Sequence, residues 1–187
     1  MDKATFDGLF DKYEPMHRRE ELHQLVNLVE WSKPHVILEL GVCFGGTWGF
    51  WHEVLPPDGF LIGVDKLHCV VRWDWKASRE NIFYIQGDIE SNKTYEGVHA
   101  LTQNNVDFLY IDSNHYYHGV KQHFDFYAPL VKEGGIIAFH DIRDNKGSGY
   151  GVGKLVNELK ERYGWMEILV PGDTGPGADG IGVIFNG

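Results

Sequence analysis

Residues 106–142 read VDFLYIDSNHYYHGVKQHFDFYAPLVKEGGIIAFHDI, and this stretch decides the fold. Two apolar runs, Val106–Ile111 and Ile136–Phe139, are each short enough to be a buried strand, and a helical pattern lies between them. A crossover of this kind makes the two strands parallel, so their carboxyl ends lie on one edge of the sheet. The stretch therefore predicts a β-α-β unit.

Both strands of this unit end in acid and histidine. Asp112 and His115 follow the first strand, and His140 and Asp141 follow the second. Ligands bind beyond the carboxyl ends of the strands in open α/β sheets. We therefore expect these four side chains to share the rim of one site.

The rest of the chain continues the alternation of strand and helix, which predicts an α/β fold with a mostly parallel sheet and helices on both faces. We expect one domain, with an N-terminal arm and helix in residues 1–34 and a cofactor-binding core in residues 35–187. The arm, residues 1–16, is expected to be irregular or to contain a short helical turn. Further strands are expected at Val36–Leu40, Phe60–Val64, Ile82–Gln86, Trp165–Val170 and Ile181–Phe185. Further helices are expected at His17–Trp31, Val70–Glu80 and Asn92–Thr102. Two more helices are expected, one with Thr47 as its N-cap and one that begins at Val152.

Composition limits the classes of partner. The chain has 187 residues and a formal net charge of -10, which disfavours nucleic acid and anionic membrane surfaces. No apolar run is long enough to span a bilayer, and the first residues lack the apolar core of a signal peptide. Cys43 and Cys69 form neither a disulfide framework nor a metal-site spacing. A reducing cytoplasm is the expected setting.

A glycine-rich turn follows the strand Val36–Leu40. The segment Glu39–Thr47 has the pattern E-x-G-x-x-x-G-G-T, which is not the G-x-G-x-x-G dinucleotide fingerprint. Asp65 and Asp88 end the next two strands, where carboxylates can bind ribose hydroxyls and an adenine amine. The combination favours a nucleoside cofactor with an amino-acid tail over a plain strand-to-helix connection.

The acid and histidine set suggests a divalent cation. Oxygen-rich ligation by Asp112 and Asp141 favours Mg²⁺ or Mn²⁺, with His140 as a softer donor, and His115 could accept a proton. Other interpretations remain open: the acids could cap helices, His140 could be a hydrogen-bonded core residue, and His115 could be a surface residue. His118, His123 and the tryptophans are expected to be bystanders or core residues.

Five segments carry a resemblance to a known family: ILELGVCFGGT (37–47), GVD (63–65), QGD (86–88), VDFLYIDSNHYYHGV (106–120) and GGIIAFHDI (134–142). Together they resemble class I S-adenosylmethionine (SAM)-dependent methyltransferases, in particular the metal-dependent O-methyltransferase branch with macrolide sugar O-methyltransferases and cephalosporin hydroxylase-like proteins. The resemblance covers the chain from Val36 onward and implies the strand order 3-2-1-4-5-7-6, with the last strand antiparallel.

The resemblance also implies roles for single residues. Asp65 would bind the cofactor's ribose and Asp88 its adenine, while Asp112 would border the cofactor and bind a metal with Asp141. His115 would be the catalytic base. The pair His140-Asp141 departs from the Glu-Asp or Asp-Asn of metal-dependent relatives, so His140 is a candidate third ligand. The methionine part would lie against the turn residues Glu39, Gly41, Gly45, Gly46 and Thr47.

We therefore expect methyl transfer from SAM to a hydroxyl of a small molecule or sugar, assisted by Mg²⁺ or Mn²⁺. Two alternatives remain: an iron-dependent hydroxylase on the same scaffold, and a non-catalytic SAM-binding protein. A homo-oligomer is possible. The sequence does not specify the acceptor.

Overall fold

A computed structural model of the chain describes residues 1–67, 80–144, 147, 149–170 and 178–187. The expected helix at Val70–Glu80 and most of the loop before the last strand lie outside this described part. The elements are α1 (Lys3–Tyr13), α2 (Arg19–Ser32), β1 (Val36–Leu40), α3 (Gly46–Val54), β2 (Phe60–Asp65), β3 (Ile82–Gln86), α4 (Asn92–Thr102), β4 (Val106–Ile111), α5 (Tyr117–Tyr127), a 3₁₀ turn (Ala128–Leu130), β5 (Val131–Asp144), α6 (Val152–Leu159), β6 (Gly164–Ile168) and β7 (Ala178–Asn186).

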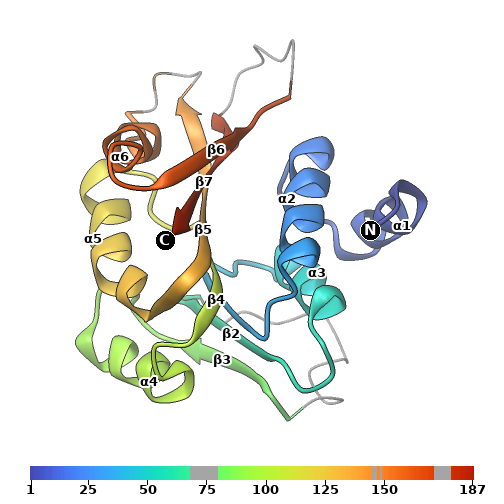
Figure 1. Cartoon of the computed structure of the whole chain (residues 1–187), viewed down its shortest axis with the longest axis horizontal. Coiled ribbons are helices and arrows are strands. Elements are labelled where there is room, and N and C mark those ends of the chain that lie inside the picture. Colours follow the sequence, from blue (N-terminus) through green and yellow to red (C-terminus); the bar gives the residue numbers. More distant parts are fainter. Residues whose placement is uncertain (68–79, 145–146, 148, 171–177) are drawn as a thin grey trace.

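The strands form one seven-stranded sheet with the order β3-β2-β1-β4-β5-β7-β6. Strands β1 to β5 pair in parallel, and β7 runs antiparallel to both β5 and β6. This confirms the predicted order and the antiparallel last strand. The carboxyl ends of β1, β2, β4 and β5 therefore lie on one edge (Figure 1).

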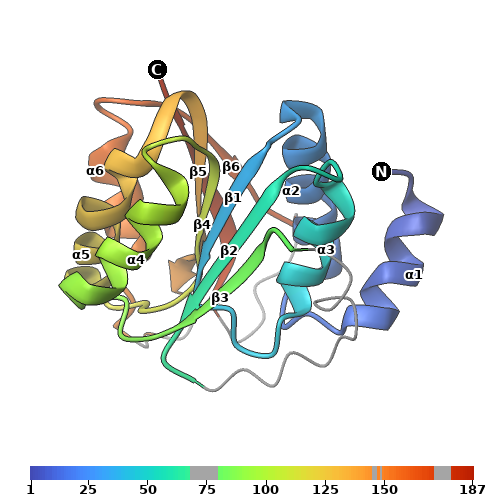
Figure 2. The same ribbon diagram turned by 90° about the horizontal axis from the view of Figure 1, so that it is seen from below.

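Helices cover both faces of the sheet, as predicted. Helices α4, α5 and α6 pack on one face, while α2 and α3 pack on the other with α1 outside them (Figures 1 and 2). Trp48 and Trp51 of α3 are fully buried against the sheet, and Tyr127 of α5 is fully buried on the opposite face. Burial of such large aromatic side chains supplies much of the hydrophobic free energy of a domain.

The N-terminal arm differs from the prediction. Residues 3–13 form the full helix α1 rather than an irregular arm or a short helical turn. Asp2 caps it by accepting a hydrogen bond from the amide of Thr5 at 3.0 Å, and Phe6 is fully buried with its ring stacked on Phe50 at 5.0 Å. The prediction missed a helical pattern, because Phe6, Leu9, Phe10 and Tyr13 recur at the spacing of one helix face.

Thr47 is not the N-cap of α3, contrary to the prediction. Gly45 occupies the N-cap position with a left-handed φ of 82°, and Thr47 lies inside the first turn. Its hydroxyl donates to the Glu39 carboxylate instead.

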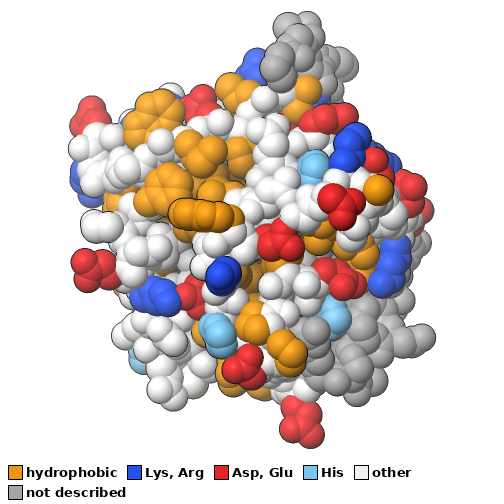
Figure 3. All heavy atoms as spheres, turned by 45° about the vertical axis from the view of Figure 1, so that its right-hand side comes forward, with side chains coloured by type: hydrophobic (Ala, Val, Ile, Leu, Met, Phe, Trp, Pro, Cys, Tyr) orange, Lys and Arg blue, Asp and Glu red, His pale blue; other side chains and the backbone are white. Residues whose placement is uncertain are grey.

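Charged side chains of both signs are interspersed over the described residues of the face in Figure 3. None of the described helices combines the length and hydropathy needed to cross a membrane.

Candidate active site

A cavity of about 470 Å³ opens at the carboxyl ends of the parallel strands. Its walls come from the turn after β1, the ends of β2 and β4, the region around Ile89, the middle of β5 and residues 14–17 before α2. The volume lies within the range of small-molecule sites. The position is the one expected for a ligand site in an open α/β sheet.

The turn after β1 approaches the end of β4 very closely. Gly41 has a φ of 93°, and a Cβ atom at this position would lie 2.0 Å from the backbone oxygen of Asp112. The predicted residues Gly41, Gly46 and Thr47 line the cavity, while Gly45 starts α3 beside it. Only glycine fits at position 41, because both its backbone angle and its surroundings exclude a side chain.

Asp65 lines the cavity and holds two loops together. Its Oδ2 accepts from the amide of Cys43 at 2.8 Å, and its Oδ1 accepts from the amide of Leu67 at 2.9 Å. The carboxylate therefore ties the glycine turn to the end of β2. This places Asp65 beside the turn, as predicted for a cofactor-binding residue.

Asp88 and Glu39 lie just outside the lining of the cavity. The Asp88 carboxylate is half-exposed, accepts from the amide of Glu90 at 3.0 Å and pairs with Lys66 at 3.2 Å. Its neighbours Ile89 and Glu90 do line the cavity. Glu39 is fully buried behind Thr47, and burial raises its pKa to about 8.

Strand β5 bulges where its functional residues lie. The register with β7 shifts between His140 and Arg143, and Asp141 has a left-handed φ of 58°. A bulge breaks the alternation of side chains along a strand and redirects them. As a result the consecutive residues His140 and Asp141 both line the cavity.

Asp112 lies at the centre of the polar cluster. Its Oδ1 is 3.3 Å from Nδ1 of His140 and 3.4 Å from Nε2 of His115. Burial alone would raise the pKa of Asp112, but the charge of His140 and the neighbouring imidazoles hold it well below its ordinary value. The N-cap of α5 is Tyr116, so the side chain of Asp112 faces histidines instead of capping that helix.

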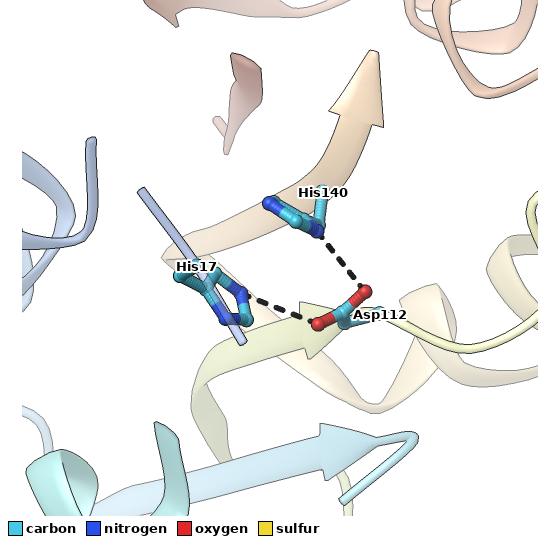
Figure 4. Close-up of side chains that lie close together, drawn as sticks. All are labelled: His17, Asp112 and His140. Atoms are coloured by element: carbon cyan, nitrogen blue, oxygen red, sulfur yellow. Dashed lines mark hydrogen bonds and ion pairs between the residues drawn. The ribbon is translucent and has the colours of Figure 1, made fainter. Parts of the chain in front are cut away.

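His17 is a site residue that the sequence did not reveal. It precedes α2, its side chain is 4% exposed, and its Nε2 lies 2.6 Å from the Tyr110 hydroxyl and 3.3 Å from Oδ2 of Asp112. Its ring lies against that of His140 at 4.1 Å between centroids. His17 and His140 thus contact Asp112 from two separate elements (Figure 4). Tertiary packing alone brings His17 to the end of β4, so no local sequence motif marks it as a site residue.

The two imidazoles that flank Asp112 respond differently to their surroundings. Burial lowers the pKa of His17, and the charge of His140 lowers it further. Burial also opposes the charge of His140, but the carboxylates of Asp112 and Asp141 outweigh burial and raise its pKa to about 9. In the metal-free chain His140 is therefore the charged partner of Asp112, and His17 is neutral.

His123, which was expected to be a bystander on its helix, lies closer to the site than expected. It is 3% exposed, lines the cavity, and places Nδ1 at 2.8 Å from the Ser113 hydroxyl oxygen. His118 is exposed, as expected. The ring of Tyr150 stacks on His115 at 4.9 Å, so this tyrosine lies beside the site.

A family model described as a methyltransferase domain matches residues 38–142, which run from β1 into β5. The chain belongs to this methyltransferase family. The matched span contains the glycine turn, Asp65, Asp112, His115, His140 and Asp141, while His17 lies before it.

Solved methyltransferases share the fold over nearly the whole chain. The O-methyltransferase from Bacillus cereus in complex with SAH superposes with a TM-score of 0.72 at 15% identity and covers 99% of this chain and 92% of that one. TomG from Streptomyces achromogenes, in complex with SAM, gives a TM-score of 0.71 at 15% identity, with 100% and 90% covered. MycE from the mycinamycin pathway, with Mg and SAH, gives 0.64 at 17% identity, with 96% and 53% covered. The predicted class I methyltransferase fold is confirmed.

Two curated relatives are longer than this methyltransferase chain. Protein y4gI of Sinorhizobium fredii is 29% identical in an alignment of length 180 that covers 86% of this chain and 18% of that protein. Protein R132 of Acanthamoeba polyphaga mimivirus is 30% identical in an alignment of length 111 that covers 54% of this chain and 50% of that protein. The chain thus spans about a fifth and a half of these two relatives.

Proposed function

We propose that the protein transfers a methyl group from SAM to a hydroxyl oxygen of a small molecule or sugar. One observation carries the proposal: a single cavity joins the glycine turn and Asp65 to the acid and histidine cluster around Asp112. The first half suits a nucleoside cofactor and the second a hydroxyl that must lose a proton. The solved relatives whose names include SAM or SAH give the same cofactor independent support. The comparisons favour neither the hydroxylase nor the binding-protein alternative.

The chemistry of the residues in the cofactor half supports the proposal that SAM binds there. Asp65 would bind the ribose hydroxyls while keeping its bonds to the turn. The adenine would lie near Asp88, where Ile89 and Glu90 line the cavity. The amino-acid tail would lie along the turn residues Gly41 to Thr47, in front of the buried Glu39. The backbone at Gly41 can approach a ligand closely because it carries no side chain.

The acceptor half fits a divalent cation. Asp112, His140 and Asp141 would hold it, because carboxylate and imidazole are the usual ligands of such ions. A bound cation would lower the pKa of the acceptor hydroxyl. Transfer forms a bond from the acceptor oxygen to the methyl carbon and breaks the bond from that carbon to sulfur, and His115 would take the hydroxyl proton. The chain's main contribution is alignment of the two reactants.

The choice of a small acceptor rests on charge and on cavity size. A net charge of -10 disfavours a nucleic-acid backbone. The cavity of about 470 Å³ would have to hold both the cofactor and the acceptor, which favours a sugar or another compact acceptor. MycE, a methyltransferase of the mycinamycin biosynthetic pathway solved in complex with Mg, SAH and mycinamycin VI, shares the fold. We propose a cytoplasmic setting from the sparse cysteines, and a homo-oligomer remains a proposal.

Calorimetric titration with SAM tests the cofactor assignment directly. We expect one SAM bound per chain, and Asp65→Asn should weaken binding by roughly 10-fold or more because it removes the ribose acceptor's charge. The exposed acid Asp58, which precedes β2, gives the matched control Asp58→Asn, with affinity unchanged. If the wild-type chain binds no SAM, the proposed function is wrong.

A further inference from the structure

Two imidazoles and two carboxylates face one another symmetrically in the acceptor half. Nδ1 of His140 lies 3.3 Å from Asp112 Oδ1 and 3.4 Å from Asp141 Oδ1. Nε2 of His115 lies 3.4 Å from the same Asp112 oxygen and 3.3 Å from Asp141 Oδ2. Each nitrogen therefore faces both acids at nearly the same separation, and all four side chains are 10–25% exposed.

These separations are longer than direct ion pairs prefer. Hydrogen bonds between an imidazolium and a carboxylate usually measure about 2.7–2.9 Å. Donors that share a cation at about 2.1 Å lie about 3.0 Å apart in octahedral geometry and about 3.4 Å apart in tetrahedral geometry. These four nitrogen-to-oxygen separations are in the range of ligands that share an ion. Two sets of donor atoms lie within 4.8 Å of one another: His115, His140 and Asp141 form one, and His17, Asp112 and His140 form the other, so His140 belongs to both.

The charge of the set matches a divalent ion. A cation would displace the proton of His140, because a metal-binding imidazole is deprotonated. Two carboxylates and two neutral imidazoles would then carry a charge of -2, which a divalent cation cancels inside a mostly buried site. Its composition differs from an oxygen-only set, because half of its donors are nitrogens. Imidazole suits Zn²⁺, Fe²⁺ and similar ions, whereas Mg²⁺ prefers oxygen ligands and retains water.

The neighbours of the four donors hold them in place. His17 Nε2 is 3.3 Å from the second oxygen of Asp112, and the Tyr110 hydroxyl lies next to His17. The amide of Gly151 donates to the backbone oxygen of His115 at 2.8 Å, on the side where Tyr150 stacks on its ring. Such outer contacts orient ligands and are characteristic of metal sites.

We infer that Asp112, His115, His140 and Asp141 form one cation site that selects an imidazole-preferring transition metal, such as Zn²⁺, over Mg²⁺. The inference rests on the proposed function for the role of the ion in methyl transfer, but the site itself is testable without turnover. It gives His115 two successive roles. In the acceptor-free chain it would help to hold the ion, and it would be able to accept the hydroxyl proton only when its ring nitrogen is not bound to the ion.

Titration of the metal-stripped full chain with Zn²⁺ and, separately, Mg²⁺ tests the site. We expect one tight Zn²⁺ per chain, with affinity on the order of 100-fold or more above that for Mg²⁺. His115→Gln and His140→Gln should each weaken Zn²⁺ binding by roughly 10-fold or more. The matched control is His118→Gln, which alters an exposed histidine of α5 near His115 and should bind Zn²⁺ like the wild type.

Equal affinity for Mg²⁺ and Zn²⁺ would overturn the inference, as would unchanged Zn²⁺ binding in His115→Gln or His140→Gln. The inference would also be overturned if His118→Gln weakened Zn²⁺ binding as much as His115→Gln and His140→Gln do, because the ion would then be held at the surface. Calorimetry with SAM on the same samples separates the two proposals. If the chain binds SAM but shows no selective Zn²⁺ site, the cation inference is wrong and the proposed methyl transfer stands. If the chain binds Zn²⁺ selectively but does not bind SAM, the proposed function is wrong and the cation site stands.

Discussion

Asp112 Oδ1 and His140 Nδ1 lie 3.3 Å apart across neighbouring parallel strands, although 28 residues separate them in the sequence. The backbone oxygen of Asp112 lies so close to Gly41 of the glycine turn that a Cβ atom at position 41 would be 2.0 Å from it. Asp112 therefore belongs to both halves of the cavity. Its backbone borders the proposed cofactor site, and its carboxylate belongs to the acceptor site.

Asp141 belongs only to the acceptor half, so its removal should separate binding from chemistry. Asp141→Ala should leave SAM affinity within about threefold of the wild type, because its contacts are with His115 and His140. Methyl transfer to a hydroxyl acceptor should fall by roughly 100-fold or more, through loss of a metal ligand. Calorimetry and a radiolabelled methyl-transfer assay measure the two effects. Unchanged turnover would refute metal assistance through this residue.

The turn at Gly41 should tolerate no side chain. Gly41→Ala should lower the free energy of unfolding by about 1–3 kcal/mol, because its φ is 93° and its Cβ would overlap the Asp112 backbone. SAM affinity should fall as well. Gly8→Ala is the matched control, since its Cβ in α1 would meet nothing within 4 Å and the change should stabilise by about 0.5–1 kcal/mol. Urea denaturation measures the free energy of unfolding of both variants. Equal changes in Gly41→Ala and Gly8→Ala would contradict the close approach of Gly41 to Asp112.

Glu39 should make the ligand-free chain less stable as pH rises. Burial raises its folded-state pKa from 4.5 to about 8, so the folded chain binds its proton more tightly than the unfolded chain. Stability from this group is complete below pH 4.5, falls as the pH rises and levels off above about pH 8. Glu39→Gln should therefore be increasingly more stable than the wild type over this window, by roughly 3–5 kcal/mol at its upper end.

Chemical denaturation at pH 5, 7 and 9 in metal-free buffer measures this difference. Glu96→Gln, which changes an exposed acid of α4, should run parallel to the wild type at every pH. A constant offset between Glu39→Gln and the wild type would show that Glu39 titrates normally in the folded chain.

The sheet and its rim could be predicted because their causes are local. Apolar runs such as Val106–Ile111 define the strands, and helical crossovers make those strands parallel, which brings Asp112 and Asp141 to one edge. The directions of side chains at that edge were less predictable. Asp88 faces Lys66 at the outside, and the bulge at Asp141 could not be seen in an alternating pattern.

The position of the N-terminal segment against the rest of the chain could not be predicted from its own sequence. Phe6 of helix α1 packs on Phe50, and Pro15 lies so close to Gly46 that a Cβ atom at position 46 would be 2.5 Å from it. This packing fixes residues 14–17 as a wall of the cavity and brings His17 to Asp112. These are contacts over long sequence separations, which no local motif encodes.

His17 should act on the cation site through Asp112. His17→Ala should weaken Zn²⁺ binding by roughly 10-fold or more, because the second oxygen of Asp112 loses the imidazole that orients it. His17→Gln, which can still donate a hydrogen bond, should recover part of the affinity. His35→Ala is the matched control, because this histidine is 59% exposed at the opposite end of the sheet, before β1, and should leave Zn²⁺ binding unchanged. A purely structural role for His17 would instead lower stability in both variants without restoring Zn²⁺ affinity in His17→Gln, so thermal unfolding measured beside the metal titration decides between the two roles.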